Sequence, residues 1–444
     1  METMKVKTTS KEIIKPSSTS PNDLQTLQLS IYDHFLPPIY TVAYLFYTKD
    51  DELMISPDHT SHKLKTSLSE TLTKLYPLAG RINGVTVDCN DEGAVFVEAR
   101  VDNCSLSGFL ASPDLKAIQQ QLLPLDAVVN PHEAASTWPL LLVKATYFQC
   151  GGMAIGVCIT HKIADAASIS TFVRTWSAEA RGEAGNTVMV PKFASANFYP
   201  PANDTYKLPV DEKANKRSSV TKRFVFSAAK LEELRTKATS PESAVDRPTR
   251  VESVTALLWK CFVAASSSET CDRKVLIQLA DLRSRLPSLL PESLIGNVMF
   301  SSVVLSTGQG EEVKIEEAIR GLRKKREELG AMIQGEDGSS SMIGSKLANL
   351  MLADYSRMSY ETHEPYTVSS WCKLPLYEAS FGWGHPVWVV GNVAPTFENI
   401  AMLIDSKDGR GIEAFVTLPE ENMSSLEQNT ELLAFASLNP RVLV

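Results

Sequence analysis

The stretch Gly152–Ser170, GMAIGVCITHKIADAASIS, carries the strongest local signal in the chain. Its first half is apolar and β-branched as far as Thr160-His161, which predicts a buried strand. The residues that follow repeat their apolar side chains at helical spacing, at Ile169, Phe172, Val173 and Trp176. His161 is therefore expected at the end of a strand, where a side chain can be held rigidly over a cleft.

Two polar residues of this stretch, His161 and Asp165, could carry chemistry. They could be a buried core histidine beside a helix-capping aspartate, or a general base held by its surroundings. A metal pair would need a third ligand, and none is suggested nearby. A Ser-His-Asp hydrolase would need a GxSxG elbow, which the sequence lacks. The spacing alone leaves the first two interpretations open.

Composition narrows the class of protein. The 444 residues are 43% apolar and 22% charged with a formal net charge of -8, which suits a folded soluble protein and disfavours a nucleic-acid-binding surface. No apolar run approaches the roughly 20 residues of a membrane span, and the first residues contain no secretory signal. Seven scattered cysteines without a CxxC pair argue against a zinc site. We expect a cytoplasmic protein without a metal.

Strand and helix signals alternate along the whole chain, which predicts an α/β protein. Strands are expected at 140–149, 153–160, 221–226, 275–280, 298–305, 387–392, 399–404 and 411–418, and helices at 62–75, after Thr249 and at 311–329. Residues 182–220 hold many Pro, Gly and Asn residues, which indicates a crossover between domains. We therefore expect domains at 1–185 and 221–444, a linker at 186–220, and a flexible loop at 334–345.

A second feature, Ser380-Phe-Gly-Trp-Gly384, is followed by His385-Pro386. Two glycines around an aromatic residue, and then a proline, predict a tight turn between strands. We expect Gly382, Trp383 and Gly384 to order a cleft without doing chemistry. His385 is expected to be an exposed residue of the turn.

These two features combine with others into a recognisable set. HKIAD at 161–165 and SFGWG at 380–384 resemble the HxxxD and DFGWG motifs of the plant BAHD acyltransferases. Supporting matches follow in the family's order: YPLAGR at 76–81, VDCND at 87–91, DLRSR at 281–285, Gly296-Asn297 and Ser370-Trp371. The resemblance runs from about residue 10 to the C-terminus and is closest to the branch that contains vinorine synthase and capsaicin synthase. It implies an α/β fold of two chloramphenicol-acetyltransferase-like domains, with mixed β-sheets and a solvent channel between them.

The resemblance also implies a reaction. His161 would take the proton from an acceptor hydroxyl or amine as that atom attacks the thioester carbonyl of an acyl-CoA. No metal, nucleotide or permanently bound cofactor is needed. In this branch the acyl group is commonly acetyl, and the acceptors are alkaloids or other specialised metabolites. The expected partners are acyl-CoA, by this resemblance the acetyl form, and a small acceptor, with no nucleic acid and no membrane, and the expected state is a monomer.

Other residues are assigned by the same resemblance. Asp165 would be structural and pair with an arginine, for which Arg283 is the first choice and Arg285 the second. Thr160 would line the channel beside the base. The donor side would use Ser369, Ser370 and Trp371. Two basic pairs stand at the end of the crossover, Lys216-Arg217 and Lys222-Arg223. Two interpretations of them stay open: cations that approach the phosphates of CoA, or a solvated basic run beside the linker.

The sequence departs from the family at Ser380, where the DFGWG motif has Asp. The family Asp is expected to form a remote ion pair, so one arginine, for which Arg285 is the candidate, would lose its partner here. Serine keeps a short hydrogen-bonding side chain but no charge. This departure leaves two alternatives to acyl transfer open. One is a divergent enzyme that uses His161 for elimination, cyclisation or ester cleavage, and the other is a non-catalytic ligand-binding protein.

Overall fold

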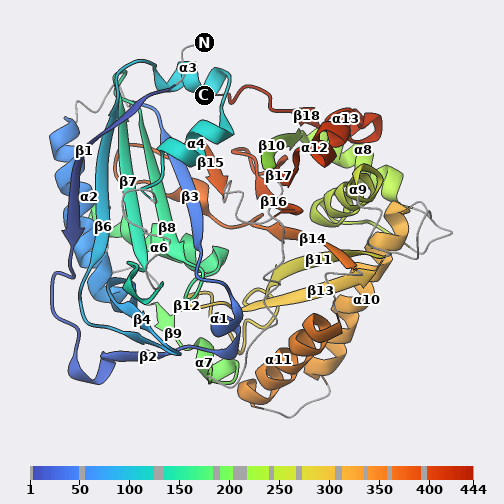
Figure 1. The fold of residues 1–444 in the computed structure, drawn as a ribbon, viewed down its shortest axis with the longest axis horizontal. Coiled ribbons are helices and arrows are strands. Elements are labelled where there is room, and N and C mark those ends of the chain that lie inside the picture. Colours follow the sequence, from blue (N-terminus) through green and yellow to red (C-terminus); the bar gives the residue numbers. More distant parts are fainter. Residues whose placement is uncertain are drawn as a thin grey trace.

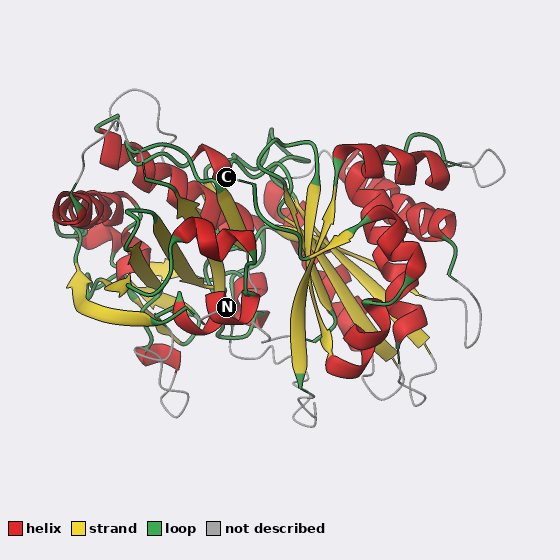
Figure 2. Cartoon of the chain, turned by 90° about the horizontal axis from the view of Figure 1, so that it is seen from above, coloured by secondary structure: helices red, strands yellow, loops and turns green. Residues whose placement is uncertain are grey.

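The computed structural model contains two large mixed β-sheets, each packed against helices (Figure 1). It describes residues 4–49, 56–124, 135–183, 191–203, 218–239, 245–266, 273–305, 313–334, 339–357, 363–391 and 398–443. Seen from above, the sheets and their helices form two bodies side by side (Figure 2). The α/β fold with mixed sheets that the sequence predicted is therefore confirmed.

The first sheet has six strands in the order β1-β6-β7-β8-β3-β15, and of these pairs only β6–β7 is parallel. The strands are β1 (Val6–Ile14), β6 (Ala94–Val101), β7 (Leu141–Phe148), β8 (Met153–Thr160), β3 (Tyr40–Tyr47) and β15 (Trp388–Gly391). Helices α2 (Pro57–Lys74) and α6 (Ala166–Arg181) pack against each other beside this sheet. β3 and β8 are buried along their whole length, which is why their sequences are almost wholly apolar.

The second sheet has seven strands in the order β13-β11-β14-β16-β17-β10-β18, with parallel pairs β11–β14 and β14–β16. The strands are β13 (Met299–Leu305), β11 (Arg273–Asp281), β14 (His363–Ser370), β16 (Ile400–Asp405), β17 (Ile412–Pro419), β10 (Ser219–Phe226) and β18 (Ser437–Leu438). Its helices are α8 (Ala228–Ala238), α9 (Arg250–Ala265) and α10 (Ile315–Gln334). α9 begins with the predicted capping box of Thr249 and Glu252.

One strand joins the two bodies. β15 belongs to the first sheet, although its neighbours along the chain, β14 and β16, belong to the second. It pairs antiparallel with β3, with Trp388 opposite Phe46. The Ser380–Gly384 turn lies on the segment that leads from β14 to β15. Thus the second half of the chain completes the first sheet.

Smaller elements lie between the two bodies at one end of the sheets (Figure 1). They are α1 (Ile31–Phe35), α7 (Ser195–Phe198) and the parallel pair of β9 (Lys192–Phe193) with β12 (Leu294–Ile295). A separate three-stranded sheet has the order β2-β5-β4, with β2 at Thr26–Gln28, β5 at Thr86–Asp88 and β4 at Arg81–Asn83. β9 and α7 fall in the predicted linker 186–220, of which residues 186–190 and 204–217 lie outside the described residues.

The remaining elements are short except for α11. The α-helices are α3 (Leu106–Ala111), α4 (Leu115–Gln121), α11 (Ser340–Arg357), α12 (Glu420–Leu426) and α13 (Thr430–Phe435). The 3-10 helices are Asn22–Leu24, Tyr76–Ala79, Ala135–Thr137 and Leu376–Glu378. None of the helices in the described residues is long and apolar enough to span a bilayer.

The prediction of a flexible loop at 334–345 is wrong over its described part. Gln334 is the last residue of α10, and α11 begins at Ser340. Ile343, Leu347 and Met351 recur at a spacing of four residues and are buried in a cluster between α11 and α7. Burial of these side chains on one helix face outweighs the Gly and Ser content on which the loop was predicted.

Candidate active site

His161 lies where β8 ends, at the position that the sequence predicted. Thr160 is the last residue of the strand, and the backbone N–H of His161 donates to the carbonyl of Ile39 at 2.7 Å. This bond holds the backbone of His161 to the segment that enters β3. The side chain is half-buried, and its ring partner, Asn297, comes from the segment between β12 and β13. The imidazole is therefore held by residues from both halves of the chain.

Asn297 fixes the tautomer of His161. Its Oδ1 lies 3.0 Å from Nδ1 of His161. Its Nδ2 donates to the carbonyl of His161 at 2.7 Å and to Oδ1 of Asp33 at 2.8 Å. Both amide hydrogens are thus used, so Oδ1 must face the ring and accept from Nδ1–H. Nε2 therefore keeps its lone pair, which a general base requires.

The protonation of His161 is biased toward the neutral form. Burial lowers the pKa of His161 below its ordinary value. A hydrogen bond of the ring with the backbone of His161 itself, the charge of Asp165, the hydrogen bond with Asn297 and the charge of Asp33 oppose this shift only in part. An amide oxygen also stabilises an imidazolium less than a carboxylate would. The imidazole is thus in the form that can accept a proton at neutral pH.

Asp165 ties this end of β8 to the second half of the chain. It begins α6 by accepting from the N–H of Ser168 at 2.9 Å. Its other oxygen accepts from Arg283 Nη1 at 2.8 Å and from the N–H of Val298 at 3.0 Å. Asp165 and Arg283 are 2% and 3% exposed, so this ion pair is almost fully removed from water. A buried pair of this kind is costly to break from one side.

Arg283, and not Arg285, is the partner of Asp165. Burial alone would raise the pKa of Asp165, but Arg283 and the hydrogen bonds from backbone N–H groups lower it overall. Arg283 also pairs with Asp281 at 2.7 Å. The guanidinium therefore has two carboxylate partners, and Asp165 serves to hold the two halves of the site together.

The Ser380–Gly384 turn supports α6 by packing. The ring of Phe381 meets that of Trp176, in α6, edge to face with centroids 4.8 Å apart, and Trp383 stacks on Phe381 at 5.5 Å. Gly382 and Gly384 have φ angles of +104° and +98°, which glycine adopts without strain. The turn thus packs against α6, the helix that Asp165 caps, through aromatic contacts.

The cation beside Ser380 is Arg181, the last residue of α6. Arg181 Nη1 donates to the backbone carbonyl of Ser380, and its Nη2 forms an ion pair with Glu183 at 2.5 Å. We expected Arg285 to lose a partner at this position, and the structure differs because the end of α6, not the 281–285 segment, faces the turn. Glu183 supplies Arg181 with a carboxylate.

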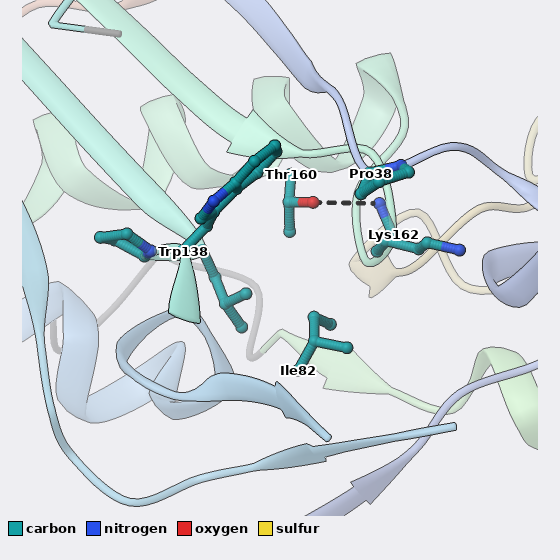
Figure 3. A pocket seen from close by; sticks show the side chains of 7 residues that line it. Pro38, Ile82, Trp138, Thr160 and Lys162 are labelled. Atoms are coloured by element: carbon teal, nitrogen blue, oxygen red, sulfur yellow. Dashed lines mark hydrogen bonds between the residues drawn. The ribbon is translucent and has the colours of Figure 1, made fainter. Parts of the chain in front are cut away.

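Thr160 lines a small cavity of about 30 Å³ beside the end of β8 (Figure 3). Its hydroxyl accepts a long hydrogen bond from the N–H of Lys162, at 3.4 Å. The other wall residues are Pro38, Ile82, Trp138, Pro139 and Leu140. The Nζ of Lys162 donates to the carbonyl of His34 at 2.6 Å. The cavity is therefore mostly apolar, with the Thr160 hydroxyl as a polar group in its wall.

Ser369, Ser370 and Trp371 lie at the end of β14, between β11 and β16. The two serines are partly exposed, and Trp371 is buried. Among the described residues, none of the three is hydrogen-bonded to His161. They therefore lie at a strand end of the second sheet, as His161 does in the first.

Of the cations suggested for CoA phosphates, only Lys222 and Arg223 lie in the described residues, and both are engaged elsewhere. Arg223 is 1% exposed, pairs with Glu413 at 3.2 Å and lies over the ring of Trp388. Its side chain is part of the core, so the expectation that it approaches a phosphate is wrong. Lys222 pairs with Glu427 at 2.7 Å. Lys216-Arg217 lies outside the described residues.

Sequence comparison places the chain in a family. A family model described as "Transferase family" matches residues 4–433. The chain is 41% identical over 449 residues to "BAHD acyltransferase BIA1" of Arabidopsis thaliana, with 99% of each chain covered. It is 37% identical over 450 residues to a limonoid 21-O-acetyltransferase of Melia azedarach, with 99% of this chain and 100% of that protein covered. The chain belongs to the BAHD acyltransferases.

A solved structure agrees with this assignment. The chain matches the crystal structure of vinorine synthase with a TM-score of 0.82 and 32% sequence identity. The match covers 99% of this chain and 100% of the vinorine synthase chain. The family and the fold together identify an acyl-CoA-dependent O-acyltransferase. Within the described residues, no group of three His, Cys, Asp or Glu side chains could hold a metal ion.

Sequence reasoning missed two residues of this BAHD site. Asn297 appeared only within the Gly296-Asn297 match, without a role. Asp33 was not singled out, although Ser30-x-x-Asp33 before an apolar run has the form of a capping box. That signal would have placed Asp33 at a helix start. It would not have placed Asp33 beside Asn297, which is 264 residues away in sequence.

Proposed function

We propose that the chain transfers an acetyl group from acetyl-CoA to a hydroxyl of a plant specialised metabolite, with His161 as the general base. The observation that carries this proposal is the hydrogen bond between Nδ1 of His161 and Oδ1 of Asn297, which leaves Nε2 as the acceptor. The lowered pKa of His161 supports it, because the base must be neutral before it acts. The acetyl group is supported by the name of the limonoid relative, an O-acetyltransferase.

The proposed reaction has one addition and one elimination step. Nε2 of His161 takes the proton of the acceptor hydroxyl as its oxygen attacks the thioester carbonyl, and a tetrahedral oxyanion forms. The oxyanion collapses, the C–S bond breaks, and the imidazolium gives the proton to the leaving thiolate. The products are the ester and free CoA. Proton transfer of this kind typically contributes about 10²–10⁴-fold in rate.

The other residues support this step from a distance. Asp165 and Arg283 would hold His161 through their buried ion pair. The turn would support α6 by packing against it, and its residues in this role are Ser380, Gly382, Trp383 and Gly384. We assign Ser369, Ser370 and Trp371 to the donor side and Thr160 to the acceptor side of a channel between the two bodies. An alkaloid is one acceptor that fits the branch this sequence resembles.

Two alternatives arose from Ser380: a divergent enzyme that uses His161 for elimination, cyclisation or ester cleavage, and a non-catalytic ligand-binding protein. Arg181 retains a carboxylate partner in Glu183, so the serine does not leave a cation unpaired there. No specific observation now favours either alternative over acyl transfer.

A thiol-release assay tests the proposal. Purified protein would be mixed with acetyl-, malonyl-, benzoyl- and hydroxycinnamoyl-CoA and a panel of plant alcohols and alkaloids, with products identified by mass. We expect release of CoA and an acetylated product with the wild type and with His385→Ala, whose histidine is exposed in the turn. We expect neither with His161→Ala. Acceptor-dependent product without CoA release, or equal turnover by His161→Ala, would contradict the proposal.

The monomeric state and the cytoplasmic location are part of the proposal: the first rests on the family resemblance, and the second on the sequence. Size-exclusion chromatography with light scattering measures the first, and imaging of a fluorescent fusion in plant cells measures the second. A mass near twice the 48.8 kDa of the chain would contradict the monomer.

A further inference from the structure

Asp33 is a buried carboxylate near the site that the proposed reaction does not use. It belongs to α1, and its side chain completes a capping box with Ser30. It is 1% exposed, and none of the ion pairs between described residues includes it. Lys162 interacts with Asp33 electrostatically without forming an ion pair. A buried carboxylate outside an ion pair is stabilised mainly by hydrogen bonds, and Asp33 is surrounded by donors.

Five hydrogen bonds are donated to this carboxylate. Oδ1 accepts from the backbone N–H of Asn297 at 3.0 Å and from its Nδ2 at 2.8 Å. Oδ2 accepts from the N–H of Ser30 at 3.0 Å, from its hydroxyl at 2.7 Å, and from the hydroxyl of Ser195 at 2.8 Å. Each oxygen therefore serves a backbone N–H, which cannot turn to become an acceptor. The side chain of Asp33 is therefore hydrogen-bonded to the start of α1, to α7 and to the segment that precedes β13.

The orientation of the Asn297 amide follows from this arrangement. If the amide were flipped, its oxygen would lie against Oδ1 of Asp33 and the carbonyl of His161, at the 2.7–2.8 Å now bridged by N–H groups. Two such contacts between oxygens are unfavourable, and the flipped nitrogen would face Nδ1 of His161. Asp33 therefore selects the orientation in which Asn297 accepts from the ring.

We propose that Asp33 is a positioning residue that acts through Asn297 to hold His161 in the Nδ1–H tautomer, with Nε2 unprotonated. Asp33 does not touch the reacting atoms. The inference rests on the proposed role of His161 as the base. It explains why a carboxylate is placed here, because a neutral amide could not accept from both backbone N–H groups at once.

The test compares Asp33→Asn with Glu252→Gln. Glu252 is a matched control, since it is also a buried carboxylate in a capping box, 2% exposed, but on α9 and paired with Arg323 and Arg326. Both variants lose a buried charge, and both are expected to be less stable. Only Asp33→Asn is expected to lower kcat, by about 10- to 100-fold, with the KM values for acetyl-CoA and acceptor changed by less than about two-fold.

The tautomer is measured directly by ¹⁵N NMR on protein labelled at the histidine ring nitrogens. The spectrum of His161→Gln identifies the His161 signals among the seven histidines. We expect Nδ1–H alone in the wild type and in Glu252→Gln, and a mixture of tautomers in Asp33→Asn. A folded Asp33→Asn with the wild-type tautomer and kcat would overturn the inference, and so would Nε2–H as the main form in the wild type.

Two further outcomes are separated by this design. If Asp33→Asn does not fold, Asp33→Ser takes its place, because water can fill the space left by the shorter side chain. The same changes in kcat and in the tautomer of His161 are expected. A folded Asp33→Ser with the wild-type tautomer and kcat would overturn the inference. If the wild type releases no CoA with any donor, the proposed function fails. The NMR comparison still decides whether Asp33 sets the tautomer.

Discussion

Arg181 and Ser380 meet at the end of α6, where the guanidinium of Arg181 donates to the backbone carbonyl of Ser380. The carboxylate that serves this arginine is Glu183, just beyond the end of α6. The contact between Arg181 and Ser380 binds the turn to the helix through the backbone of Ser380, so it does not need a charged side chain at this position.

This relationship predicts an interaction between positions 183 and 380. Ser380→Asp should change the melting temperature little in the wild type, because two carboxylates would then compete for Arg181. In the Glu183→Gln background the same substitution should raise the melting temperature, because the introduced carboxylate would be the sole acidic partner. Thermal unfolding of the four proteins measures this difference. An equal effect of Ser380→Asp in both backgrounds would show that the two positions are not coupled.

Asp165→Asn should reduce stability more than it changes chemistry. The substitution leaves a buried arginine with one carboxylate in place of two, and we expect a loss of about 3 kcal/mol in the free energy of unfolding. Asp281→Asn is the control, because Asp281 is one-third exposed and Arg283 keeps Asp165; we expect about 1 kcal/mol. Urea denaturation measures both. Lost turnover in Asp165→Asn without lost stability would argue for a direct catalytic role.

The rate should depend on pH through His161. Its pKa is lowered by burial, so kcat/KM should rise with pH and reach half its maximum below about pH 6.5, the ordinary value for histidine. The pKa of His161 is lower in the folded protein than in the unfolded chain. Its contribution to the free energy of unfolding is therefore fully present above the unfolded pKa, and it is lost as the pH falls through the folded pKa. Comparing the pH dependence of unfolding in the wild type and His161→Gln isolates this contribution. A half-maximum above about pH 7 would contradict the lowered pKa.

Gly382→Ala and Gly384→Ala should both destabilise the protein by about 1–3 kcal/mol, because each residue has a positive φ that alanine rarely adopts. At 382 the added methyl would also meet Lys63 Nζ at 2.7 Å, whereas no atom lies within 4 Å at 384. The long lysine can move, so the difference between the variants should be small. Turnover per folded molecule should be unchanged in both, as measured at a temperature where each is folded. A selective loss of turnover would place the turn closer to the chemistry.

The parts that the sequence predicts well are those that depend on local patterns. The strand at 153–160, the helix that Asp165 begins and the capping box at Thr249 all follow from spacing and residue type. The pairing of Asp165 with Arg283 follows from the family resemblance and agrees with the structure. These features need no knowledge of how distant segments meet.

The parts that could not be predicted depend on contacts between distant segments. Asn297 is hydrogen-bonded to His161 although 136 residues separate them in sequence. Asn297 lies in a loop, and periodic patterns do not predict which loop side chains contact a distant residue. The sequence predicted a strand at 387–392, which corresponds to β15. It did not predict that this strand pairs with β3, because the residues of a strand do not determine which strand it pairs with. The prediction of a loop at 334–345 is wrong over its described residues for a different reason: the Gly and Ser content was given more weight than the apolar spacing of α11.

The position of β15 has a consequence for how the molecule can be divided. A fragment that ended at residue 203 would keep five strands of the first sheet but leave β3 as a bare edge, open to pairing with other chains. We expect such a fragment to aggregate when made alone and to become soluble when co-expressed with residues 218–444, which would donate the missing strand. The two bodies should accordingly melt in a single cooperative transition, so that the halves of the chain are partners in folding as well as in holding His161.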